Sequence, residues 1–264
     1  MCLLVKRIGL GLWLLVGLSG LSPSAEEAKS AAYPRRLIDP LEFVDGKVSG
    51  KVNDATLAAL LNRKLVVGAD DGYKFLTKDE AETYLRTETI AQYRKARAQG
   101  AGPWTTFDIS MDSFFVGVGG ALRFLEICRD AEKSAFKDAW LKQLSISMLG
   151  WNDSDQEVIH NRDKAAGLTL ADYARDKKIK FTESAADRLV FEFGGRLYVV
   201  DWAASGDCDG DGFEDRLISV AWYYKEGSAR SYDTYVAKYA DPSKPDVSLT
   251  EFDQVVPRTS DEVD

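Results

Sequence analysis

The chain has 264 residues, with 42 acidic and 34 basic side chains and a formal net charge of −8. This excess of negative charge argues against nucleic acids and anionic membrane surfaces as partners, because both repel an acidic protein. The length is sufficient to bury a sizeable core, in one large domain or two small ones.

The first 25 residues have the pattern of a secretory signal peptide. Lys6 and Arg7 precede an apolar run over residues 8–21, and small residues follow at 22–25. The run is shorter than the about 20 residues that cross a membrane, so we expect a cleaved signal rather than a retained anchor, which is the alternative. The mature chain would begin near Glu26 and be exported, to the periplasm or the extracellular space. It would keep 32 basic against 42 acidic residues, a net charge of −10.

A flexible leader is expected over residues 26–40, and a helix-rich part over 41–177. Asn53 is a good N-cap for a helix over 54–61. A short hairpin is expected around Asp71-Gly72, followed by a helix that a capping box at 77–80 opens and by helical sequence up to Gly100. Further helices are expected over 112–150, 154–164 and 168–177.

An antiparallel sheet is expected over residues 178–240, as a meander of about four strands. Two apolar runs, 189–193 and 196–202, flank Gly194-Gly195, which is a strong hairpin signal. Two more strands are expected over 216–224 and 232–239. The sequence therefore predicts an α+β domain over 41–253, with a helical N-terminal part packed on the C-terminal sheet, and a disordered tail over 254–264.

An acidic loop joins the second and third of these predicted strands. Residues 207–215 read DCDGDGFED, which places Asp at relative positions 1, 3, 5 and 9 and Gly at position 6. Carboxylates held this close repel one another, and a divalent cation removes that penalty. Calcium takes six to eight oxygen ligands, so this loop predicts a calcium site, with a solvated acidic turn as the alternative.

The loop resembles the D-x-D-x-D-G-x-x-D calcium loops of FG-GAP-type repeats and EF-hand-like extracellular proteins. The resemblance covers about nine to fifteen residues and implies a Ca²⁺ ligand set of Asp207, Asp209, Asp211 and Asp215, with the backbone carbonyl of Phe213. The chain departs from an EF-hand at position 12, where Ile218 replaces the bidentate Glu. It departs from a propeller because the loop occurs once.

Two cysteines remain after the signal, which carries Cys2, is removed. Cys208 is the second residue of the acidic loop, and Cys128 lies in the helix-rich part. Export to an oxidising compartment predicts a disulfide between them, which would tie the loop to the helical half. Two unpaired thiols are the alternative.

Other motifs carry weaker signals. Residues 117–122 superficially resemble a dinucleotide fingerprint, but the third Gly is replaced by Leu122, which favours close helix packing instead. His160 is the only histidine and has no recognisable metal-binding or nucleophile partners in sequence, so it is interpreted as a helix residue. The aromatic residues of the sheet are interpreted as core, with a carbohydrate site as the alternative: Trp202, Trp222, Tyr223 and Tyr224.

Taken together, these signals favour an exported, calcium-stabilised binding or structural protein whose partner is a protein or a carbohydrate ligand. Catalysis is not expected from the sequence. The alternative is a secreted hydrolase that uses two carboxylates, for example on carbohydrate, with calcium as a structural ion. A cleft with two facing carboxyl groups, away from the acidic loop, would favour the hydrolase.

Overall fold

The computed structural model describes residues 33–66, 73–76, 84–102, 106–149, 154–224, 230–239 and 247–252. The chain divides into two units, Met1–Ser30 and Ala31–Asp264, and all described residues belong to the second. The expected signal peptide and C-terminal tail lie outside the described residues.

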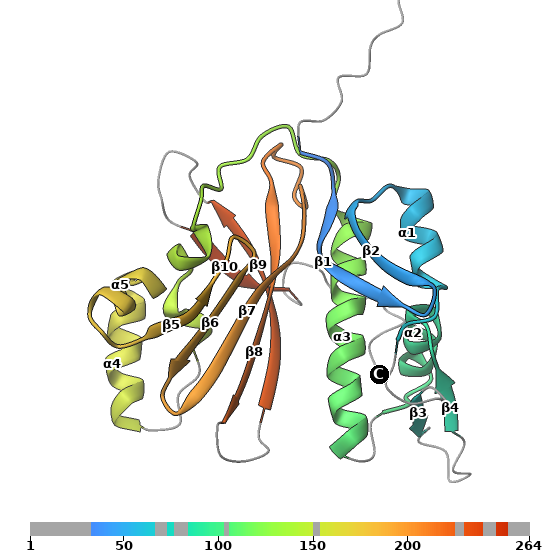
Figure 1. Cartoon of the computed structure of the whole chain (residues 1–264), viewed down its shortest axis with the longest axis horizontal. Helices are drawn as coiled ribbons and strands as arrows, with labels where there is room; N and C mark the ends of the chain where they lie inside the picture. The colour runs from blue at the N-terminus through green and yellow to red at the C-terminus, as the bar shows by residue number, and fades with distance from the viewer. Residues whose placement is uncertain are drawn as a thin grey trace, which may run out of the picture. The chain divides into compact units, whose positions relative to one another are not determined.

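The second unit contains strands and helices in mixed order (Figure 1). The strands are β1 (Arg36–Phe43), β2 (Gly46–Lys51), β3 (Tyr73–Leu76), β4 (Tyr84–Thr87), β5 (Lys180–Ser184), β6 (Arg188–Phe193), β7 (Arg196–Gly206), β8 (Asp215–Tyr224), β9 (Arg230–Tyr239) and β10 (Val247–Glu251). The helices are α1 (Asp54–Leu61), α2 (Ile90–Ala98), α3 (Thr106–Ile127), α4 (Ser154–Ala165) and α5 (Leu170–Arg175), with 3-10 turns η1 (Trp140–Gln143) and η2 (Ile146–Met148).

Eight of the described strands form one antiparallel sheet, in the order β10-β9-β8-β7-β1-β2, with β6 also paired to β7 and β5 to β6. One edge of β7 pairs with β8 along its whole length. The other edge is shared, because β6 pairs with residues 196–201 and β1 pairs with residues 204–205. The strand β7 is therefore the centre of the sheet.

The predicted fold class is wrong. We expected a helical N-terminal part packed on a C-terminal sheet of about four strands, but β1 and β2 come from the first fifty residues and join the same sheet as the C-terminal strands. The strand β1 takes in residues 36–40, at the end of the expected leader. It includes Pro40, which has no N–H to donate, and the ladder with β2 is irregular between Leu37 and Leu41.

Several local predictions are confirmed. Asn53 caps α1 by accepting from the Thr56 N–H, and α2 ends one residue before Gln99. The Gly194-Gly195 hairpin joins β6 to β7, and β8 and β9 continue the meander. The expected turn at Asp71-Gly72 and the capping box at 77–80 lie outside the described residues. The helix expected to follow that capping box is wrong in part, because Tyr84–Thr87 forms β4 and pairs with β3. The helical pattern expected over 112–150 is also wrong beyond Ile127, where α3 ends.

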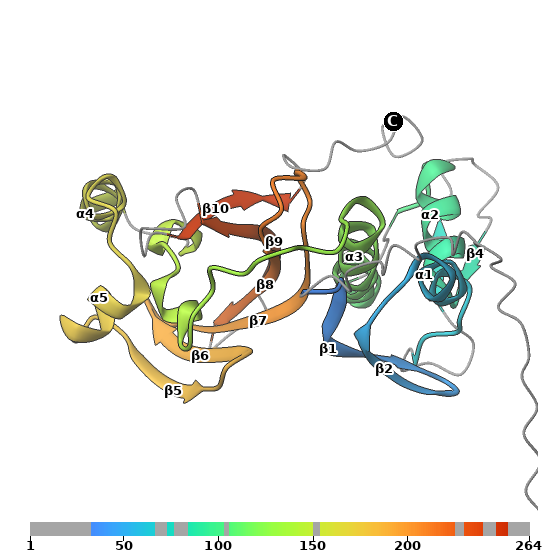
Figure 2. The ribbon, with the colours of Figure 1, turned by 90° about the horizontal axis from the view of Figure 1, so that it is seen from above.

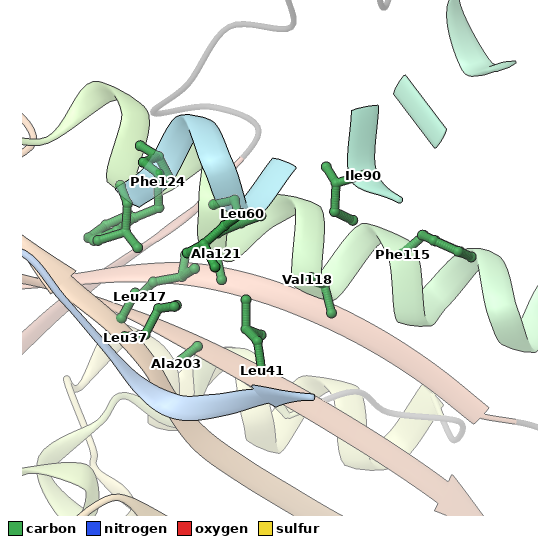
Figure 3. Close-up of a cluster of buried hydrophobic side chains, with 14 of the residues drawn as sticks. Leu37, Leu41, Leu60, Ile90, Phe115, Val118, Ala121, Phe124, Ala203 and Leu217 are labelled. Atoms are coloured by element: carbon green, nitrogen blue, oxygen red, sulfur yellow. The ribbon is translucent and has the colours of Figure 1, made fainter. Parts of the chain in front are cut away.

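The sheet is covered on both faces, and each face has its own core. On one face, α3 lies between the sheet and helices α1 and α2 (Figure 2). There Leu37 and Leu41 of β1 extend toward Val118 and Ala121 of α3 (Figure 3). On the other face, the segment from η1 to α5 packs on β6–β9 around the buried Tyr198.

This double coverage explains the mostly apolar sequences of β7 and β8. In β8, Ile218 and Val220 enter one core and Leu217 enters the other. Each fully buried side chain of this size contributes about 1.5–3 kcal/mol to folding. Within the described residues, no helix has the length and apolar character needed to cross a membrane.

Candidate functional site

The acidic loop of residues 207–215 connects the ends of β7 and β8. Gly206 pairs with Asp215 across the two strands, so the first and last aspartates of the loop lie near each other. The segment after α3 runs beside the loop. The Arg129 N–H donates to the Asp207 carbonyl at 2.9 Å, and the Asp207 N–H donates to the Arg129 carbonyl at 2.8 Å. The start of the loop is therefore held by the sheet and by this second segment.

The predicted disulfide between Cys128 and Cys208 is confirmed. The two Cα atoms are 4.0 Å apart, and 80 positions separate the cysteines in sequence. Gly206 is required beside it, because a Cβ at this position would lie 2.8 Å from the Cβ of Cys128. The bridge joins the end of α3 to the second residue of the acidic loop.

Asp207 organises the first half of the loop from a buried position, with 3% of the residue exposed. Its Oδ1 accepts from the Gly210 N–H at 2.6 Å, and its Oδ2 accepts from the Gly212 N–H at 3.1 Å. Both glycines are left-handed, with φ of 82° and 87°. This backbone conformation is costly for other residues, which explains Gly at the sixth position of the loop.

The other carboxylates continue this pattern. Asp209 Oδ1 accepts from the Asp211 N–H at 3.2 Å, and Asp211 Oδ1 accepts from the Phe213 N–H at 2.8 Å. Asp215 Oδ2 accepts from the Cys208 N–H at 2.9 Å. Asp209, Asp211 and Asp215 therefore each have one oxygen committed to the loop backbone, whereas Asp207 has both.

Three of the predicted ligands come together. Asp207, Asp209 and Asp215 each offer an oxygen, and these oxygens lie within 4.8 Å of one another. Oxygens on opposite sides of a calcium ion are about 4.6–5.2 Å apart, so the spacing fits one ion. Asp211 is outside this group. Among the described residues the Phe213 carbonyl accepts no hydrogen bond, which leaves it free for a cation.

Two basic side chains balance the cluster. Lys238 of β9 places its Nζ 2.7 Å from Asp209 Oδ2 and 3.5 Å from Asp215 Oδ2. Arg129 places its Nε 3.4 Å from Asp207 Oδ2. Nothing in the sequence indicates Lys238, because it is distant along the chain and reaches the loop only through the β8–β9 pairing. An ion in the loop would compete with its ammonium group.

The pKa values reflect this balance. Burial raises the pKa of the Asp215 carboxyl to about 6, with the charges of Asp209 and Asp211 adding to the effect and the Cys208 N–H and Lys238 opposing it. Burial also acts to raise the pKa of Asp209, but hydrogen bonds from Lys238 and the Asp211 N–H bring it below its usual value. Positive charge at this site is therefore favourable, and the negative charge of Asp215 is less well compensated than that of Asp209.

The remaining residues that the sequence singled out have packing roles in the structure. His160 is buried in α4, where burial lowers its pKa. Residues 117–122 lie inside α3, so they do not form the strand-to-helix turn of a dinucleotide site. The Trp202 ring centroid is 3.8 Å from Cζ of Arg216, and Trp222 is 4.0 Å from Cζ of Arg196. These rings hold arginines of the same sheet.

A second site, which the sequence did not indicate, is a cavity of about 500 Å³ between α3 and the sheet face formed by β1, β7, β8 and β9. Small-molecule sites typically have volumes of about 300–1,000 Å³. Tyr232 crosses from β9 to α3 at Gly117, where an added Cβ would lie 2.6 Å from the Tyr232 hydroxyl oxygen. Ser219 shares a hydrogen bond with that hydroxyl.

Three acids border this cavity, Asp39 and Glu42 on β1 and Asp201 on β7, and the charge of Asp39 acts on Asp201. Asp201 forms an ion pair with Arg188 at 3.2 Å. Burial nevertheless raises the pKa of Asp201 to about 6, and the charges of Asp39 and Asp187 add to this effect while Arg188 opposes it. The pKa of Asp39 is raised as well, first by partial burial. Acidic residues are too frequent in this chain for sequence to identify this pair.

Comparisons of the chain with protein-family models, with curated proteins and with solved structures find no match.

Proposed function

We propose that this chain is an exported binding or structural protein whose sheet is stabilised by one calcium ion in the 207–215 loop. The observation that carries the proposal is the group of oxygens from Asp207, Asp209 and Asp215 within 4.8 Å of one another, at the junction of the two central strands. The carbonyl of Phe213 is available as a further ligand. Calcium would supply positive charge next to the buried Asp215 carboxylate.

The structural role follows from where the loop lies. It connects β7, the centre of the sheet, to β8, and the disulfide joins it to the end of α3. An ion here would fix the relative positions of both strands and of α3. The signal-like N-terminus and the disulfide both support export, because disulfides persist in oxidising compartments.

Direct calcium binding tests the proposal. Metal-free protein would be titrated with calcium in the presence of a low-affinity fluorescent chelator. We expect one site with a dissociation constant on the order of 10⁻⁵–10⁻³ M, because the bidentate Glu of an EF-hand is missing. Asp209→Asn should weaken binding about tenfold or more, and Asp138→Asn, a matched change at an exposed acid outside the loop, should not. Absence of saturable binding up to about 10 mM calcium would rule out the site.

The second candidate function is a secreted carboxylate-dependent hydrolase. The cavity that Asp39 and Asp201 border supports it, because no residue of the 207–215 loop is among the described residues that line this cavity. Glycoside hydrolysis uses one protonated carboxylic acid and one carboxylate. With a pKa of about 6, Asp201 keeps part of its proton near neutral pH, as a general acid requires.

A panel of chromogenic aryl glycosides tests the hydrolase. The wild-type protein should release the chromophore, Asp201→Asn should lower the rate by about a hundredfold or more, and Asp138→Asn should retain the full rate. Equal rates for the Asp201 variant and the wild type would exclude this carboxyl from catalysis.

A further inference from the structure

The charges around the cavity between α3 and the sheet are unbalanced. Three acids are among its described lining residues, Asp39, Glu42 and Asp201, and no Lys, Arg or His is. Glu42 is paired with Lys47, and Asp201 is paired with Arg188. The side chains of both cations are well exposed. The Asp39 side chain forms no hydrogen bond or ion pair with the described residues, and the charge of Arg188 only partly offsets the burial that raises its pKa. The cavity therefore has more negative than positive charge available to a ligand.

A large part of the wall is apolar, with Phe114 and Val118 from α3 and Leu41 and Ala221 from β1 and β8. Figure 3 shows Leu41 and Val118 extending toward each other from the strand and the helix. A hydrated metal ion would gain nothing from this wall, and a neutral ligand would leave the carboxylates uncompensated.

We propose that this cavity binds a small organic cation, an ammonium group with apolar substituents, with Asp39 and Asp201 as its counter-ions. The ammonium group would lie between the two carboxylates, and its substituents would contact Phe114 and Val118. Recognition of this kind combines a charge pair with burial of apolar surface in a site partly shielded from water.

This site goes beyond the calcium function and does not depend on it. It supplies a ligand class for the proposed binding role. The cavity and the acidic loop share no described residue, so the two sites are separate. The two proposals can therefore fail separately, because calcium binding is tested with chelators and cation binding is measured in EGTA.

The test uses the full mature chain in EGTA at pH 8, titrated by calorimetry or ligand-observed NMR. The probes are choline, tetramethylammonium and benzylammonium, with dimethylbutanol as the uncharged carbon analogue of choline. We expect at least one cation to bind with a dissociation constant on the order of 0.1–10 mM. Choline should bind about tenfold or more tightly than dimethylbutanol, because only choline compensates the carboxylates.

Variants locate the binding. Asp39→Asn and Asp201→Asn should each weaken cation binding about tenfold, and the matched control Asp138→Asn should leave it unchanged. Ala221→Leu should abolish binding by filling the cavity without a change of charge. Melting temperatures verify that all variants fold. If only one of Asp39→Asn and Asp201→Asn folds, that variant alone is sufficient for the test.

The pH dependence of choline binding provides an independent test. The charged or titratable groups around the pair are Asp39 and Glu42 from β1, Glu183 from β5, Asp187 and Arg188 at β6, and Tyr232 from β9. Binding of choline, whose charge is permanent, should weaken as the pH falls from 8 to 5, since Asp201 takes up a proton. No saturable binding of any of the three cations, equal affinity for choline and its neutral analogue, or full affinity in both Asp variants would overturn the proposal.

Discussion

Lys238 is the side chain that sets the charge of the acidic loop. Its Nζ lies 2.7 Å from Asp209 and 3.5 Å from Asp215, and these contacts raise its own pKa despite partial burial. A lysine and a calcium ion would compete for the same carboxylates. Without calcium, the lysine supplies the positive charge next to Asp209 and Asp215.

Replacing Lys238 with Met should therefore separate these two roles. We expect Lys238→Met to lower stability in EGTA by about 1–2 kcal/mol, because Asp209 and Asp215 lose their partner. Calcium affinity should rise about three- to tenfold, because the ion no longer displaces an ammonium group. The matched control is Lys133→Met, since Lys133 lies over the Phe213 ring and contacts none of the loop carboxylates in the described structure. Calcium binding no tighter than in the wild type would contradict this competition.

Asp163 of α4 is a buried carboxylate with a strongly lowered pKa. Hydrogen bonds from Lys178, Arg162 and Tyr173 lower its pKa to about 2, against the cost of burial. A folded-state pKa below the unfolded value contributes stability above pH 4, and this contribution is lost as the pH falls through 2.

The corresponding variant gives a testable pH dependence. Asp163→Asn should lower the free energy of unfolding by about 2 kcal/mol at pH 7. The difference from the wild type should shrink between pH 4 and pH 2, where the wild-type carboxyl takes up its proton. Urea unfolding at these pH values measures it, and a difference that stays constant down to pH 2 would show that the ion pairs contribute nothing.

At the scale of elements, the disulfide and the acidic loop form one unit. The chain-entropy model gives roughly 4–5 kcal/mol for closing a loop of this length. Reduction should therefore lower the melting temperature by about 10 °C or more and weaken calcium binding, because Cys208 lies next to the proposed ligand Asp207. The Cys128→Ala/Cys208→Ala double variant should show no response to reductant. A melting temperature unchanged by complete reduction of the wild type would contradict this role.

Local signals in the sequence were sufficient to predict many elements but not their assembly. Asn53 marked the start of α1, and Gly194-Gly195 marked the β6–β7 hairpin, because caps and tight turns depend on neighbouring residues. The strand β1 was missed because its sequence contains Pro40 and lacks a clean alternation. Its pairing with β7, Arg36 to Ser205, spans most of the chain and leaves no local signal.

Some residues of the two candidate sites were likewise predictable from local sequence signals, and others were not. The aspartates of the loop and the Cys128–Cys208 bridge were predicted from spacing and cysteine count. Lys238 and the Asp39–Asp201 pair were not, since each depends on strands that are adjacent only in the folded sheet. The sequence also placed Asp211 with the other ligands, whereas its carboxylate caps Phe213.

At the scale of the whole second unit, one sheet separates two cores and carries both candidate sites. The acidic loop lies where β7 turns into β8, and the cavity lies where α3 leaves the sheet partly uncovered. A ligand at either site would contact β7 or β8. Stability of the entire sheet is therefore the quantity that reports on calcium.

The melting temperature with calcium and with EGTA is the most direct test of the central claim. At about 100 times its dissociation constant, calcium should stabilise the fold by roughly 2.7 kcal/mol and raise the melting temperature by several degrees. Asp209→Asn should reduce this response to about half or less, and Asp138→Asn should keep it. Equal melting temperatures of the wild-type protein in calcium and in EGTA would mean that Lys238 and Arg129 alone balance the loop, and the calcium function would be wrong.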